Sequence, residues 1–384
     1  MSEHEIDHQN RAHAKLSASG SSRWLNCPGS VKAEEGYSNE SSVFAEEGTL
    51  AHELADTCLK KQKDAEAYVG KKITGKVIEL DMARYVQEYL DYVLSHETDN
   101  SKLFTEERVD FSNIVPGGFG TMDAAVLDFD SKVCHIFDLK YGKGVEVDAY
   151  ENTQAQLYAL GLYNELGFLD EIESFRVHIV QPRIYNFSHW DISVTDLVKF
   201  GKWVKQRAEL ALTSDAPRVP GDKQCQWCKA KGECKALAKF TEQIISAEFD
   251  NLDEVELSEH NLSDDKKKTI LDNKSLIESF LKAVESSVYE HIDAGGTFKG
   301  YKLVEGRSIR KWTDDAEAVL VEKLGDEAYK KSLIGITDAQ KKIGKEEVDT
   351  LAYKPPGKLT LVPESDKRKA VIKQDITDDF EELD

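Results

Sequence analysis

Two acidic residues and a lysine near the middle of the chain have the types and spacing of a metal-dependent hydrolytic site. Asp123 lies in the run GFGTMDAAVLDF, and the run KVCHIFDLKYG contains Asp138 and Lys140. Both runs are typical of strands, and a two-residue turn at Asp130-Ser131 would pair Asp123 directly with Asp138. Opposed residues of a hairpin share a sheet face, with Cβ atoms about 4.5–5.5 Å apart. Two carboxylates at that distance repel each other unless a cation lies between them.

This arrangement predicts phosphodiester hydrolysis. Paired carboxylates suit Mg²⁺ or Mn²⁺, and such an ion activates water and neutralises a scissile phosphate. Side chains alternate along a strand, so Lys140 shares a face with Asp138 and can stabilise charge in the transition state. The intervening Leu139 should point into the core, with its carbonyl still within reach of a metal. The alternative is a solvated hairpin with exposed charges, because the D-x-K pattern is common by chance.

The flanking segments indicate an α/β layer with a mixed sheet. Their order along the chain is helix, three strands, helix, strand, after an initial helix over GTLAHELADTCLKK with Thr49 as its N-cap. The other predicted helices are DMARYVQEYLDYVLSH and ENTQAQLYALGLYNELG, and the predicted strands are KLFTEERVDF, the two runs quoted above and SFRVHIVQPR.

Four motifs, in order, resemble the RecB-like branch of the PD-(D/E)xK nuclease superfamily. GTMD resembles its G-x-x-D motif, DLK its D/E-x-K motif and QAQLY its Q-x-x-x-Y motif, while GTLAHELA places a histidine on an earlier helix. The resemblance covers roughly residues 20–240 and implies a restriction-endonuclease-like core. It implies that His52, Asp123 and Asp138 bind metal and that Lys140 assists catalysis. It also implies that Gln154 and Tyr158, four residues apart on one helix face, position DNA.

Four of the six cysteines form a candidate metal site. CQWCKAKGEC places Cys225, Cys228 and Cys234 as C-x2-C-x5-C, and Cys27 in RWLNCPGS is the candidate fourth ligand. This layout resembles the iron–sulfur nucleases of the AddB type and of CRISPR adaptation, which implies a structural [4Fe–4S] cluster. A zinc ion held by the same thiolates is the alternative, because spacing alone does not separate the two.

Composition and charge set the broad class of the protein. The chain has 384 residues, 40% of them hydrophobic, and a net charge of −21 that argues against unspecific adhesion to nucleic acid. The polar N-terminus lacks the apolar centre of a signal peptide, and six cysteines are too few for a disulfide scaffold. We therefore expect a cytoplasmic protein, with no membrane span.

Changes in composition along the chain suggest five segments. We expect a flexible N-terminus, a nuclease domain that includes the cysteines, an acidic linker, a smaller α+β accessory domain that begins with a long charged helix, and an acidic tail. These segments are residues 1–22, 23–245, 246–263, 264–373 and 374–384.

A wider resemblance suggests a biological role. GSSRWLNCPGS, EEGTLAHELA and LVPESDKRKA look like a phage and prophage family of RecB-like proteins. The resemblance implies an exonuclease that resects linear double-stranded DNA ends for recombination in the bacterial host cytoplasm, usually with 5′→3′ polarity, and a single-strand annealing protein as partner. The alternative is a non-catalytic DNA-end-binding scaffold with a four-cysteine zinc site. The sequence leaves processivity and oligomeric state open.

Overall fold

The computed structural model describes most of the chain. The described residues are 14–37, 43–166, 172–246, 263–306, 310–330, 332–353, 355 and 360–369. Most of the predicted flexible N-terminus, nearly all of the predicted linker and the whole acidic tail therefore lie outside the described residues. The chain divides into two compact units, residues 1–298 and 299–384.

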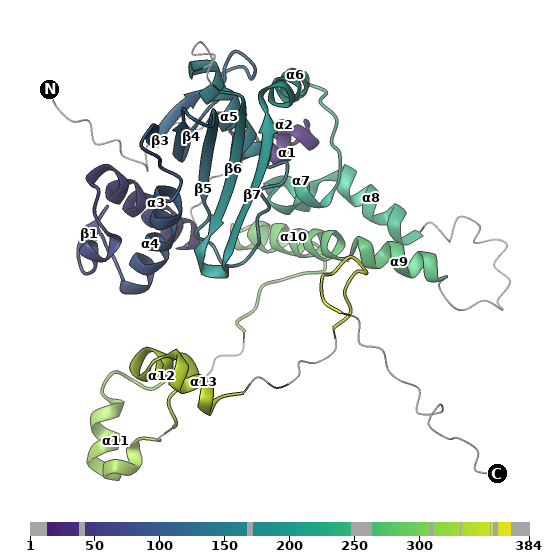
Figure 1. Ribbon diagram of the computed structural model, residues 1–384. Helices are drawn as coiled ribbons and strands as arrows, with labels where there is room; N and C mark the ends of the chain where they lie inside the picture. Colours follow the sequence, from purple (N-terminus) through teal and green to yellow (C-terminus); the bar gives the residue numbers. More distant parts are fainter. Residues whose placement is uncertain are drawn as a thin grey trace, which may run out of the picture. The chain divides into compact units, whose positions relative to one another are not determined.

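A five-stranded mixed sheet forms the centre of the first unit (Figure 1). The strands lie in chain order, and every neighbouring pair is antiparallel except β5 and β6, which are parallel. A parallel pair needs a crossover connection, and the helix α5 (Thr153–Leu166) supplies it. The strands are β3 (Ser101–Asp110), β4 (Phe119–Asp128), β5 (Val133–Leu139), β6 (Ser174–Gln181) and β7 (Asn186–Ser193).

Helices cover both faces of this sheet. On one face α5, α6 (Val194–Ala211) and α1 (Ser21–Asn26) enclose an apolar core that includes Trp24 and Leu157. On the other face α3 (Val43–Lys61) and α4 (Leu80–Leu94) enclose a second core that includes Leu54, Tyr89 and Phe137. This three-layer arrangement confirms the predicted α/β fold class. The short elements are α2 (Ser30–Ala33), η2 (Ala65–Tyr68), β1 (Lys72–Ile73), β2 (Lys76–Val77) and η4 (Pro182–Ile184).

The predicted register of the β4–β5 hairpin is confirmed, although four residues, 129–132, connect the strands instead of the predicted two-residue turn. Leu127 pairs with Cys134 and Ala124 with Phe137, so the same register places Asp123 opposite Asp138 at the end of the ladder. Leu139 is fully buried in the core under α3 and α4, as expected. The hairpin therefore brings the two carboxylates together through purely local pairing.

The prediction for the start of α3 was wrong. Thr49 is not an N-cap but an interior residue, and its hydroxyl donates to the carbonyl of Ala45 one turn earlier. Threonine hydroxyls make this bond inside helices as readily as they cap a helix, so its position alone did not identify the helix end.

The first compact unit extends to residue 298, beyond residue 245, where the predicted nuclease domain ends. The expected single helix after residue 264 is two helices, α9 (Asp264–Asp272) and α10 (Lys274–Asp293), and both belong to the first unit. Leu276 and Phe280 of α10 pack with Leu237 in a small apolar cluster beside the cysteines. The helix α10 packs against three elements of the cysteine region: α7 (Asp222–Gln226), η5 (Lys229–Glu233) and α8 (Lys235–Ser246).

The second unit contains short helices in its described residues. They are α11 (Ala316–Leu324), η6 (Gly325–Ala328), α12 (Ile336–Ile343) and α13 (Lys345–Leu351). The strands expected of an α+β accessory domain do not form among the described residues of this unit. In the part of the chain that the structure describes, every helix is too short or too polar to span a bilayer.

Candidate active site

The end of the β4–β5 hairpin brings a histidine to one of the two predicted carboxylates. His52 lies at the middle of α3, and its Nδ1 is 2.9 Å from Oδ1 of Asp123. The other oxygen of Asp123 accepts a hydrogen bond of 2.7 Å from the backbone N–H of Leu139. The carboxylate of Asp123 is thus fixed between α3 and β5.

The second carboxylate is held by a chain of three polar side chains. Lys140 Nζ lies 2.8 Å from Oδ2 of Asp138 and donates to Oε1 of Gln154 at 3.0 Å. The amide nitrogen of Gln154 then donates to Asp138 Oδ1 at 3.2 Å and to Tyr158 Oη at 2.9 Å. Gln154 and Tyr158 sit one turn apart on α5. Four of the five predicted catalytic residues therefore form one connected network, in which Gln154 contacts both the lysine and Asp138. The fifth, Asp123, is bonded to His52 and to the backbone of Leu139 instead.

The sequence analysis missed a further acidic residue, Glu106. Ligand atoms of His52, Glu106 and Asp123 all lie within 4.8 Å of one another. Because Thr105 pairs with Ala124 and Glu107 with Met122, Glu106 lies across from Asp123 on the neighbouring strand. The register of β3 against β4 was the signal that could have found it.

The backbone at Glu106 is itself unusual. Its φ of 47° lies in the left-handed region, although the residue sits within a strand and carries a Cβ. Such strained residues cost about 1–3 kcal/mol and persist only where the surrounding structure holds them. The strain interrupts the regular alternation of β3 where it passes Asp123.

The pKa values of the two aspartates shift in opposite directions, because neighbouring charges offset the effect of burial to different extents. Burial raises the pKa of Asp138, and the negative charge of Asp123 adds to this effect, although Lys140 opposes it. Burial also acts to raise the pKa of Asp123, but His52 and the Leu139 N–H outweigh it, so this pKa lies below its usual value. Burial acts to lower the pKa of Lys140, but the negative charge of Asp138 outweighs it. The pKa of Lys140 therefore lies above its usual value, and the ammonium group stays charged.

A glycine lets α5 approach the sheet at this point. A Cβ on Gly120 would lie 2.6 Å from Cε1 of Tyr158 and 3.3 Å from Cβ of Ala18. The glycine of GTMD therefore leaves the space that the Tyr158 ring occupies. This contact sets how closely Gln154, one turn earlier on α5, stands to Lys140 and Asp138.

The donor set fits a divalent cation. Carboxylate oxygens are the ligands that Mg²⁺ and Mn²⁺ prefer, and an imidazole suits Mn²⁺ better than Mg²⁺. The metal ligands predicted from the sequence were His52, Asp123 and Asp138, whereas the closest cluster contains Glu106 in place of Asp138. Asp138 lies beside this cluster, where it is bonded to Lys140 and Gln154.

The four predicted cysteine ligands line one cavity. Cys27 follows α1, Cys225 lies in α7, and Cys228 and Cys234 flank η5. Arg218 and Lys231 line the same cavity. Burial raises the pKa of Cys27, Cys225 and Cys228, the last to about 11, so thiolate ligation here needs a cation that displaces the protons.

The N-terminal segment reaches this cavity through close backbone contacts. The N–H of Gly29 donates to the carbonyl of Pro217 at 2.9 Å, and the N–H of Val219 donates to Sγ of Cys27 at 3.2 Å. A Cβ on Gly29 would lie 2.5 Å from the carbonyl oxygen of Ala216, so only glycine fits there. The other two cysteines, Cys58 and Cys134, are buried in the two cores of the sheet, as expected.

Comparison with known proteins gives a family and distant structural likenesses. The model of a family described as a protein of unknown function (DUF2800) matches residues 13–369. A crystal structure of a candidate exonuclease from Eubacterium rectale is 12% identical with a TM-score of 0.34, over 55% of this chain and 85% of that one. The crystal structure of SSO0001 is 15% identical with a TM-score of 0.28, over 60% of this chain and 90% of that one. These likenesses are too distant to indicate a shared function.

Proposed function

The chain belongs to the DUF2800 family, and we propose that it is a divalent-metal-dependent DNA nuclease with a PD-(D/E)xK active site. One observation carries the proposal: Asp138, Lys140 and Gln154 form a bonded network, and Asp123 lies opposite Asp138 in the hairpin register, where it joins His52 and Glu106. Three of these groups are acids in a largely buried site, an arrangement that a bound cation would stabilise.

His52, Glu106 and Asp123 would hold the ion, with Asp138 next to them. When bound, Mg²⁺ or Mn²⁺ would supply Lewis-acid stabilisation of the phosphate and lower the pKa of a water molecule. Lys140 keeps its proton and places a positive charge where negative charge develops on the phosphate oxygens. Gln154 holds Lys140 and Asp138 in position, and Tyr158 fixes Gln154 in turn.

The test is degradation of linear duplex DNA in the presence of Mg²⁺ or Mn²⁺, with the wild-type protein beside Asp138→Ala. The expected result is degradation by the wild type and loss of that activity in the variant. Equal degradation by both would remove Asp138 from the mechanism. Absence of cleavage by either, with DNA still bound, would favour the non-catalytic end-binding scaffold instead.

The proposal extends to the substrate and role of the enzyme. By its resemblance to phage and prophage RecB-like proteins, it would act as an exonuclease on linear double-stranded ends during homologous recombination. A single-strand annealing protein would be its partner, and 5′→3′ polarity would make the product that such a partner needs. Duplexes labelled at one 5′ or one 3′ end test this step, because release of label from 3′ ends first would contradict it.

We also propose that the four cysteines hold a structural [4Fe–4S] cluster. All four cysteines line one cavity, so their thiolates could share one metal centre. The resemblance to the iron–sulfur nucleases favours the cluster over a zinc ion held by the same thiolates.

Iron and sulfide analysis, together with visible absorption, tests the cluster. Anaerobically purified wild-type protein should contain close to four irons and four sulfides, and Cys225→Ser should lose most of both. Cys58→Ser is the matched control, because Cys58 is buried in a different core and should leave the iron content unchanged. Zinc without iron in the wild type would contradict the proposal.

A further inference from the structure

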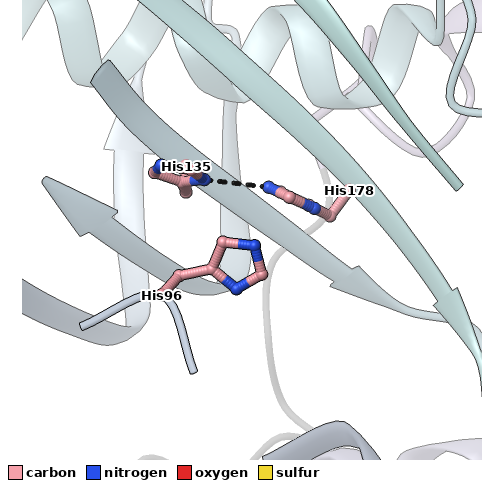
Figure 2. Close-up of side chains that lie close together, drawn as sticks. All are labelled: His96, His135 and His178. Atoms are coloured by element: carbon pink, nitrogen blue, oxygen red, sulfur yellow. Dashed lines mark hydrogen bonds between the residues drawn. The ribbon is translucent and has the colours of Figure 1, made fainter. Parts of the chain in front are cut away.

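Three histidines from separate segments converge away from the carboxylate site. His96 follows the C-terminal end of α4, His135 lies in β5 and His178 in β6. One nitrogen from each ring lies within 4.8 Å of the others. Figure 2 shows the three rings turned toward a common point, with one ring nitrogen of His96 facing the other two rings.

The hydrogen bonds around these rings leave suitable nitrogens facing one another. Nδ1 of His135 and Nε2 of His178 are 3.0 Å apart (Figure 2). The other nitrogen of His178, Nδ1, bonds the Tyr92 hydroxyl at 3.0 Å, and Nδ1 of His96 bonds the carbonyl oxygen of Tyr92 at 2.8 Å. Histidines that ligate metals characteristically use their second nitrogen in this way, which fixes the tautomer and the ring orientation.

Burial and neighbouring charge favour the neutral form of two of these rings. His135 and His178 are 9% and 1% exposed, and the rings of Tyr92, Phe137 and Phe187 surround the group. Burial lowers the pKa of His135 to about 4 and that of His178 to about 2, and the neighbouring imidazoles add to both effects.

Charged side chains of β4, β6 and β7 act on the cluster. Those that act on His135 are Arg176, Asp128 and Asp191, and Arg176 forms an ion pair with Asp191 at 2.6 Å. His189 on β7 also faces His178, at 6.0 Å between ring centroids. The rings of His135 and His178 are therefore neutral in a mainly aromatic setting, with nearby acids to offset added positive charge.

We propose that His96, His135 and His178 bind a divalent transition metal ion, Zn²⁺ in preference to Mg²⁺. Imidazole nitrogens are ligands for zinc, copper and nickel, whereas Mg²⁺ prefers oxygen ligands, which these three side chains do not offer. Three protein ligands and one water complete a tetrahedral zinc site. The ion would join the end of α4 to β5 and β6, three segments that are far apart in the sequence.

This site is separate from the proposed nuclease centre. His135 and Asp138 are three residues apart on β5, so alternation points their side chains to opposite faces of the sheet. The rival explanation is a hydrogen-bonded pair of neutral histidines that stabilises the aromatic core without any ion. Metal binding distinguishes the two.

The test compares zinc binding by three forms of the full-length protein after removal of metal with a chelator. The variant His96→Ala removes the ligand that lies beyond the helix end and is only partly buried, so the two strands keep their own contacts. His189→Ala is the matched control, because it removes a neighbouring imidazole that is outside the trio. Zn²⁺ is titrated in excess Mg²⁺, which occupies the carboxylate site, and bound zinc is counted by elemental analysis.

We expect the wild type and His189→Ala to bind one more equivalent of zinc than His96→Ala, or to bind it at least about tenfold more tightly. Equal stoichiometry and affinity in the wild type and His96→Ala would overturn the proposal, as would an equal loss in His189→Ala. Circular dichroism of the metal-free proteins checks that His96→Ala is folded.

Co²⁺ gives an independent readout. A His96-dependent visible band without thiolate-to-cobalt charge transfer supports the three-histidine site. A band that carries thiolate charge transfer and survives in His96→Ala places the ion at the cysteines and overturns it.

Discussion

Replacement of Gly120 by alanine tests how the sheet positions the proposed catalytic network. The added Cβ would lie 2.6 Å from Cε1 of Tyr158, so the ring must retreat by about 0.8 Å to regain the 3.4 Å of an ordinary contact. Overpacking of this kind costs about 1–3 kcal/mol of stability. Tyr158 holds Gln154, which holds Lys140 and Asp138. A misplacement near 1 Å can lower a rate by on the order of a hundredfold, and we expect that loss in kcat.

The assay measures degradation of linear duplex DNA at saturating Mn²⁺, with urea unfolding of the same preparations. The matched control is Gly335→Ala, because its added Cβ meets nothing within 4 Å and its φ of −65° suits alanine. Tyr158→Phe removes only the hydroxyl and should be the milder variant of the site. If Gly120→Ala folds and degrades DNA at the wild-type rate, the contact between Gly120 and Tyr158 does not position the catalytic residues.

Three further changes test the rest of the structure. Lys140→Met should lower the cleavage rate by on the order of 100–1,000-fold, because it removes the positive charge that stabilises the transition state. DNA binding in a filter assay should persist, and an unchanged cleavage rate would contradict the proposed role of Lys140. Glu106→Gln should raise the Mn²⁺ concentration for half-maximal activity by about tenfold or more, and an unchanged value would exclude Glu106 as a ligand. Leu54→Ala should cost about 2–5 kcal/mol in urea unfolding, because Leu54 is fully buried, whereas Leu271→Ala at a half-exposed position should change stability by less than about 0.5 kcal/mol.

The parts of the site that the sequence predicted depend on local pairing. The turn between β4 and β5 fixes the register of the hairpin, so the pairing of Asp123 with Asp138 follows from a few adjacent residues. Gln154 and Tyr158 share a face because one helical turn separates them. Short-range geometry of this kind is visible in a single sequence.

The parts that the sequence did not predict depend on contacts between distant segments. Glu106 reaches Asp123 only through the β3–β4 register, and a long irregular connection separates these strands. His135 and His178 meet because β5 and β6 pair in parallel across a helical crossover, which places His178 beside Phe137. The packing of α10 on the cysteine region likewise depends on a few apolar residues such as Leu276. Neither hydrophobic periodicity nor motif spacing contains this information.

The helix α1 contacts both the cysteine cavity and the start of α5, which carries Gln154 of the proposed active site. Cys27 directly follows this helix, and Arg207 of α6 donates from Nε to the carbonyl of Leu25 at 2.6 Å. At its other end, the hydroxyl of Ser21 lies 2.8 Å from that of Thr153, the first residue of α5. Gln154 follows Thr153 in sequence. Ligation of Cys27 would thus restrain the segment that contacts the start of α5, and a metal centre at the cysteines would help to place Gln154, which contacts Lys140.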